Sequence, residues 1–274
     1  MKWTVLSDNR TNDSRFLTEH GLSIFLETER HKILLDTGAS DAFIRNAKLL
    51  NIDLNSVDYV FISHGHNDHA GGLRYFLNLN HHAKVIVSSV ALSGNFFSKR
   101  NHLHSITTTW PEIDNDRLLP VDKPCKIADE IYAIAEIPHV HPMPKGNQYL
   151  FTEGANGDYV HDEFRHELAL YIDRLLFTGC AHSGLENILA ACPWSVDIVV
   201  GGFHLLDGQE TTEELLALAK RLNENYPQTQ FYTSHCTGEE VFELMKSVMG
   251  TKLQSFCCGN QFTTPFTEKG SNIK

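Results

Sequence analysis

Residues 63–72 read SHGHNDHAGG, and the rest of the chain is organised around them. The four candidate metal ligands here, His64, His66, Asp68 and His69, fall within six residues. Strands repeat every two residues and helices every 3.6, so neither puts all four side chains on one face. The spacing therefore indicates a loop that wraps around an ion, and imidazoles with a carboxylate suit zinc or a similar cation. The alternative is a polar loop whose histidines are only solvated.

The segments on either side place this loop between a buried strand and a helix. Residues 57–62 are apolar on both faces and rich in β-branched side chains, which predicts a buried strand. Leucines and aromatic residues recur at helical spacing from Leu73 onward. Further strands are expected at 2–6, 22–26, 31–35, 84–88, 168–172, 174–177, 196–200 and 230–233.

Three later helices share an expected start signal, a capping box of the form S/T-x-x-E. The boxes begin at Ser183, Thr211 and Thr237. His182 directly precedes the first box, and His235 lies two residues before the third. All candidate ligands therefore fall at strand-to-helix junctions, the edge of an α/β sheet where ligands bind.

The H-x-H-x-D-H motif after a hydrophobic strand resembles the signature of the metallo-β-lactamase fold superfamily. Further motifs resemble one subgroup, the proteins similar to 7,8-dihydropterin-6-methyl-4-(β-D-ribofuranosyl)aminobenzene-5′-phosphate synthase. These motifs are LLDTG at 34–38, TGCAHSG at 178–184, GGFHL at 201–205 and SHCTG at 234–238. The resemblance implies a four-layer αββα sandwich, whereas periodicity alone predicts only an α/β protein with mixed sheets.

The resemblance also implies a ligand set. His64 and His66 would hold a first ion, and Asp68, His69 and His235 a second. The superfamily's usual bridging aspartate is replaced here by Cys180, and its H-x-x-G-H loop is absent.

These two departures leave the first ion short of ligands. We expect His182 to complete its site. Cys180 is a weaker candidate, because a thiolate is a good zinc ligand but most free cysteines are simply small buried residues. The departures leave open whether the site holds one ion or two.

Other residues are expected to act around the metal. Asp68 is expected to pass protons, and His204 to contact the substrate or leaving group, although a simple loop histidine is the alternative. Asp36 and Glu167 could orient ligand histidines from behind. Four other histidines are more typical of a protein surface, although one could replace the missing loop ligand: His139, His141, His161 and His166.

Composition narrows the class of protein. The chain has 274 residues, 42% of them hydrophobic and 21% charged, as in ordinary globular proteins. A net charge of -11 argues against nucleic acid as a partner but not against a small anionic substrate, because a metal supplies local positive charge. The six cysteines fit no zinc-ribbon spacing, and no apolar run approaches a membrane span, so we expect a cytoplasmic protein without membrane contact.

The chain has no Gly/Ser/Pro-rich linker, so we expect a single domain over residues 1–274. Loop-rich insertions are expected near 93–120 and 136–166, lining or covering the site. The oligomeric state stays open.

The function expected from these features is a metal-dependent hydrolase. One or two zinc ions, or manganese or iron, would activate hydroxide toward a small anionic substrate such as a phosphorylated compound. Two alternatives stay open: a pterin-type transferase that displaces pyrophosphate, and a non-catalytic metal-binding sensor.

Overall fold

Two mixed seven-stranded sheets face each other in the structure, a computed structural model that describes residues 1–264. The first sheet has the order β18-β1-β2-β3-β4-β5-β8 and the second β17-β16-β15-β14-β13-β10-β9. The strands of the first sheet are β18 (Gln261–Thr263), β1 (Lys2–Ser7), β2 (Ser23–Glu27), β3 (Lys32–Leu35), β4 (Tyr59–Phe61), β5 (Lys84–Ser88) and β8 (Leu118–Val121). Those of the second are β17 (Leu253–Ser255), β16 (Gln230–Thr233), β15 (Ile198–Val200), β14 (Leu175–Phe177), β13 (Ala169–Ile172), β10 (Ile131–Ile134) and β9 (Cys125–Ala128).

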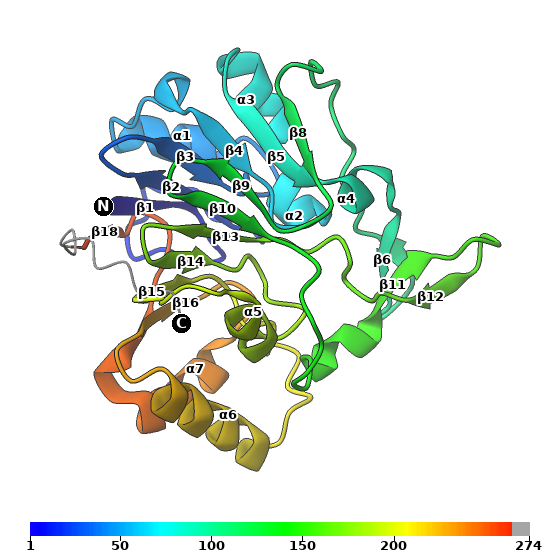
Figure 1. The fold of residues 1–274 in the computed structure, drawn as a ribbon, viewed down its shortest axis with the longest axis vertical. Coiled ribbons are helices and arrows are strands. Elements are labelled where there is room, and N and C mark those ends of the chain that lie inside the picture. The colour runs from blue at the N-terminus through cyan, green and yellow to red at the C-terminus, as the bar shows by residue number, and fades with distance from the viewer. Residues whose placement is uncertain (265–274) are drawn as a thin grey trace.

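Helices cover the outer face of each sheet (Figure 1). One apolar cluster fills the space between the sheets, where Phe61 meets Phe177 edge to face at 6.1 Å. A second cluster packs α1 and α3 on the first sheet, and a third packs α5, α6 and α7 on the other. The helices are α1 (Ala42–Leu49), α2 (Asn67–Ala70), α3 (Leu73–Leu79), α4 (Ser89–Ser93), α5 (Leu185–Ala191), α6 (Thr212–Asn225) and α7 (Glu239–Met249). The expected four-layer αββα sandwich is confirmed.

Strand direction explains where the candidate ligands gather. Strands β14, β15 and β16 are parallel to one another, so the loops that follow them leave the second sheet at the same edge. These loops carry His182, His204 and His235, while the loop after β4 brings in the 63–72 segment from the first sheet. The site therefore lies where one edge of each sheet meets the other.

The two insertions form a third sheet rather than plain loops. Its order is β12-β11-β6-β7, with β6 (Phe96–Ser98) and β7 (His104–Ser105) from the first insertion and β11 (Leu150–Glu153) and β12 (Tyr159–His161) from the second. These strands are two to four residues long, too short for alternation to reveal them. Thr107, in the first of these segments, forms an isolated β-bridge with His66, so this segment contacts the loop that carries the candidate ligands.

Only one of the three expected capping boxes forms. Thr211 caps α6, and Glu214 returns the hydrogen bond to the backbone of Thr211. The boxes at Ser183 and Thr237 are wrong, because Gly184 and Gly238 take the N-cap positions with φ angles of 91° and 84°. Glycine adopts these angles without steric cost, so each helix starts one residue later than its box predicts.

Within residues 1–264, the helices are all too short or too polar to cross a membrane.

Candidate metal centre

Three buried histidines form the first cluster of candidate ligands. His64, His66 and His182 each offer a ring nitrogen, and these atoms lie within 4.8 Å of one another. Among the described residues, none hydrogen-bonds to the Nε2 atom of any of the three. A buried polar atom left without a partner is costly, so three converging at one point fit a bound cation.

The electrostatics of these rings favour the metal-binding form. Burial, helped by the neighbouring histidines, lowers the pKa of His64 and of His182 well below the ordinary value. The same causes lower the pKa of His66 to about 3. The rings are therefore neutral near pH 7, and neutral imidazole is the form that binds a metal ion.

A second cluster lies beside the first and contains a carboxylate. The Nε2 atoms of His69 and His235 are 3.1 Å apart, and Asp68 Oδ2 lies 3.6 Å from the former and 3.3 Å from the latter. Burial opposes a charge on His235, but Asp68, Cys236 and Asp8 together outweigh it and raise the pKa of His235 to about 9. A cation bound here would take the place of that proton.

Cys180 lies between the two clusters, in the position where the resemblance implies an aspartate. Its Sγ atom is 3.0 Å from His69 Nε2. It also shares a potential metal site with His64 and His69, and another with His182 and His204. Burial raises the pKa of this thiol well above its usual range, so the thiol needs a cation to ionise. The structure thus places Cys180 as a potential ligand, not as a distant core residue.

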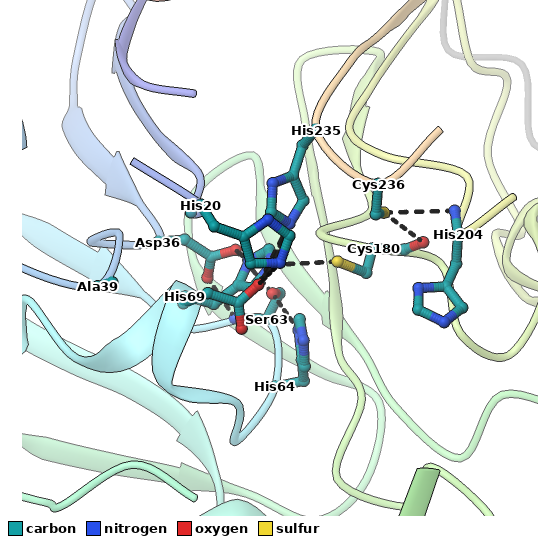
Figure 2. A network of polar contacts seen from close by, with 12 residues as sticks. His20, Asp36, Ala39, Ser63, His64, His69, Cys180, His204, His235 and Cys236 are labelled. Carbon is teal, nitrogen blue, oxygen red and sulfur yellow. Dashed lines mark hydrogen bonds and ion pairs between the residues drawn. The ribbon is translucent and has the colours of Figure 1, made fainter. Parts of the chain in front are cut away.

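Asp36 links one ligand of each cluster, His69 directly and His64 through Ser63, as Figure 2 shows. Its Oδ2 atom lies 2.6 Å from His69 Nδ1 and accepts a 2.7 Å hydrogen bond from the Ser63 hydroxyl, and its Oδ1 accepts one from the Ser63 amide at 2.7 Å. Ser63 Oγ in turn lies 2.8 Å from His64 Nδ1. One carboxylate therefore orients a ligand in each cluster, which keeps both Nε2 atoms facing the metal position.

Glu167 holds the main chain of a ligand rather than its ring. Its two carboxylate oxygens accept hydrogen bonds from the backbone amides of His182 (2.6 Å) and Ser183 (2.7 Å). The His182 ring is instead positioned by Asn147 Oδ1, 3.2 Å from Nδ1, and by the Phe164 ring stacked at 4.6 Å. Asn147 lies in the second insertion, so this insertion also supports the site.

His235 is held by residues that the sequence did not single out. Asn9 Oδ1 lies 2.9 Å from His235 Nδ1, and Asp8 Oδ1 accepts a hydrogen bond from the His235 amide at 3.1 Å. Asp8 and Asn9 directly follow β1, so the rule that ligands gather at strand ends could have found them. His20, mostly exposed, was also missed; its Nε2 lies 3.4 Å from Asp68 Oδ2.

His204 is buried beside the first cluster. Its ring centroid is 4.1 Å from that of His182, and neither ring nitrogen has a hydrogen-bond partner among the described residues. Its φ angle of 51° turns the chain sharply after the double glycine 201–202. The neighbouring Cys236, also missed, accepts a hydrogen bond from the His204 amide at 3.3 Å.

One histidine expected at the surface is buried instead. His166 accepts a hydrogen bond from the Gly65 amide at 3.0 Å, and its other ring nitrogen lies 2.9 Å from Asp162. It therefore holds the H-x-H loop in shape, and the surface expectation was wrong for this residue. His139, His141 and His161 are exposed.

Comparison with known proteins agrees with this geometry. A family model of the Metallo-beta-lactamase superfamily matches residues 18–226. The chain belongs to the metallo-beta-lactamase superfamily. Membership implies that it binds divalent metal, and it supports a hydrolase-type function.

Two relatives from Methanocaldococcus jannaschii and one solved structure are similar over most of the chain. The uncharacterized protein MJ0448 is 28% identical over 85% of this chain and 90% of its own. The 7,8-dihydropterin-6-methyl-4-(beta-D-ribofuranosyl)-aminobenzene-5′-phosphate synthase is 27% identical over 86% of this chain and 87% of its own. The crystal structure of Tm1679, described as a metal-dependent hydrolase of the beta-lactamase superfamily, has a TM-score of 0.80 and 29% identity, covering 96% and 99% of the two chains.

Proposed function

We propose that this protein is a metal-dependent hydrolase that acts on a small anionic substrate. The observation that carries the proposal is the set of three buried, unpartnered Nε2 atoms beside a second cluster that contains a carboxylate. Nitrogen and carboxylate ligands with a thiol between them suit two zinc ions, with manganese or iron as alternatives.

The proposed roles follow from the two clusters. His64, His66 and His182 would hold one ion, and Asp68, His69 and His235 the other, with Cys180 between them. A divalent ion bound there would lower the pKa of water to about 7 and stabilise the negative charge that develops on the substrate.

The chain's own residues would complete the reaction. The Asp68 side chain is partly exposed, so its carboxylate can accept a proton from the attacking water. His204 lies beside His182 with both ring nitrogens free of protein partners, so it can contact the leaving group.

A small molecule fits the site better than a nucleic acid does. The net charge of -11 opposes binding of a long polyanion, whereas two metal ions give a strongly positive local field. The proposed substrate is therefore a compact ester, thioester or lactone that carries an anionic group.

A second candidate function is a pterin-type transferase that displaces pyrophosphate. The observation in its favour is the 27% identity to the named synthase over most of both chains. Incubation with a dihydropterin pyrophosphate and an aminobenzene acceptor, followed by mass spectrometry, tests it directly. A condensation product, without hydrolysis of phosphoester, thioester or lactone substrates, would favour the transferase.

Metal analysis and a substrate panel test the hydrolase. We expect purified protein to carry about two divalent ions per chain, in keeping with two-metal sites of this kind, and to hydrolyse at least one phosphoester, thioester or lactone. His66→Ala should lose metal and turnover, whereas His81→Ala, at an exposed loop histidine, should keep both. Folded protein that binds no divalent ion would refute the proposal. Full metal occupancy without turnover in either the hydrolysis or the condensation assay would point to the non-catalytic metal-binding sensor.

A further inference from the structure

A fixed guanidinium stands just after β6, outside the set of metal ligands. Arg100 donates from Nε and Nη2 to the two carboxylate oxygens of Asp207, at 2.7 and 2.6 Å. Its Nη1 donates to Ser98 Oγ at 3.0 Å. These three hydrogen bonds fix the plane of the guanidinium, yet they use only three of the five N–H groups that an arginine has.

Contacts on both sides place this group at the edge of the metal centre. Asp207 lies three residues after His204, in the same loop. A Cβ atom on Gly146 would lie only 2.7 Å from Asp207 Oδ2, and the next residue, Asn147, holds His182. The Asp207 end of the ion pair is therefore tied to the same segments that position His182 and His204.

The other end is tied to the metal loop. Strand β6 carries Phe96, whose ring lies 5.7 Å from that of His66 and 4.0 Å from that of His166. The main cause of the raised pKa of Arg100 is its hydrogen bonding to Asp207. Burial lowers this pKa, and Asp68 and Cys236 raise it further. The Arg100 end of the ion pair is therefore joined, through β6, to the loop that carries His66.

Exposure leaves room for a ligand. The Arg100 side chain is 38% exposed, whereas that of Asp207 is only 16% exposed. The partner is thus largely covered while the guanidinium reaches solvent. An arginine held by a carboxylate behind it, with N–H groups left over in front, is preorganised to take an oxyanion without further loss of side-chain freedom.

We propose that Arg100 binds the anionic group of the substrate, a phosphate or carboxylate, beside the metal centre, and that Asp207 and Ser98 hold its guanidinium in position. This inference rests on the proposed function, because it names the residue that selects anionic substrates. Arginine suits the task because its planar fork matches the oxygens of both groups.

The competing explanation is that the ion pair only ties the third sheet to the 201–208 loop. The two explanations differ in what Asp207 does. If Arg100 recognises an anion, Asp207→Asn leaves the guanidinium present but less well held. If the ion pair is only structural, removing either partner should change phosphate affinity and stability by the same amount.

Phosphate binding to the zinc-loaded protein separates them. We expect Arg100→Gln to weaken the affinity for inorganic phosphate roughly ten- to a hundredfold, as loss of a charge-assisted contact does, with Asp207→Asn weakening it less. Arg100→Lys should recover part of the affinity. Arg45→Gln removes an exposed arginine of α1 that pairs with Asp41, the residue before the helix, and serves as the matched control, with no change expected. Isothermal titration calorimetry gives the affinities, and metal content and Tm are measured for each variant.

Three outcomes would overturn the inference. Arg100→Gln could bind phosphate as the unchanged protein does. It could instead lose zinc, which would make Arg100 a support of the metal centre. Arg100→Gln and Asp207→Asn could also lose phosphate affinity and Tm equally. If Arg100→Gln does not fold, Arg100→Lys decides between the two explanations. A phosphate affinity below that of Asp207→Asn supports recognition of the anion by Arg100, and a phosphate affinity equal to that of the unchanged protein overturns it.

Two further comparisons separate this inference from the proposed function and identify the anion. Weaker phosphate binding in Arg100→Gln, together with no turnover on any panel substrate, would sustain the inference while the hydrolase proposal fails. Turnover by the unchanged protein, together with phosphate affinity and KM that Arg100→Gln leaves unchanged, would sustain the hydrolase proposal while the inference about Arg100 fails. Repeating the titration with acetate distinguishes a phosphate site, which binds phosphate more tightly, from a carboxylate site.

Discussion

Replacing Asp36 by asparagine should weaken metal binding while leaving the backbone in place. Asp36 is fully buried and has a φ angle of 55°, a conformation that asparagine tolerates as well as aspartate does. The substitution therefore keeps the shape of the side chain and removes its charge and one acceptor. What changes is the support of His69 and, through Ser63, of His64.

The size of the effect follows from the three short contacts of the carboxylate. Its oxygens lie 2.7 Å from the Ser63 amide, 2.7 Å from the Ser63 hydroxyl and 2.6 Å from His69 Nδ1. An asparagine has one acceptor oxygen, so its amide nitrogen must face a buried donor. Leaving such a donor unsatisfied costs about 1–3 kcal/mol of stability. Losing a carboxylate behind a ligand histidine lowers metal affinity roughly 10- to 100-fold.

Two measurements check this prediction. Competition with a chelator gives the metal affinity, and denaturant unfolding of metal-free protein gives the stability. Asp58→Asn is the matched control, because Asp58 accepts a 2.8 Å hydrogen bond from the Lys32 amide but supports no histidine. Asp36→Asn protein with undiminished affinity for divalent metal would refute the view that this carboxylate orients the ligands.

Three further predictions concern the thiol, the acid response and the core. Cobalt-substituted protein should show thiolate-to-metal charge-transfer absorption that Cys180→Ser removes and Cys192→Ser keeps; a band that survives Cys180→Ser would exclude Cys180 as a ligand. Burial holds the pKa of His66 at about 3, below the 6.5 of an exposed histidine, so the unfolded chain binds more protons between these values. Metal-free protein should therefore lose the contribution of His66 to stability as the pH falls from 6.5 toward 3, and an unfolding free energy that does not fall between about pH 6.5 and pH 4.5 would contradict the reasoning. The pKa of His235, raised to about 9, acts in the other direction and lowers stability as the pH rises above 6.5. Trp3→Ala, which removes a ring stacked 3.9 Å from Phe262, should cost about 3–5 kcal/mol in denaturant unfolding without changing metal content; loss of metal would show that the core and the site are coupled.

The residue pattern of the sequence predicted an α/β protein with mixed sheets and the gathering of the ligands, and the family resemblance added the four layers. The apolar run at 57–62 and the ligand loop after it are local features, and local features leave a periodic pattern in the chain. Four candidate ligands within six residues need no tertiary contact to be close together. His182 and His235 could be placed beside them because both stand at strand-to-helix junctions.

Only the tertiary structure decided which residues hydrogen-bond to the candidate ligands and their loop, and which residue lies between the two clusters. Asn9 reaches His235 across 226 positions of sequence, and His166 reaches Gly65 across 101. The third sheet joins two insertions whose short strands carry no pattern of their own. Such contacts depend on how the two sheets pack face to face, and periodicity reports only neighbours along one strand or helix. That packing puts Cys180 between the two clusters of candidate ligands and brings Arg100 to Asp207 in the 201–208 loop.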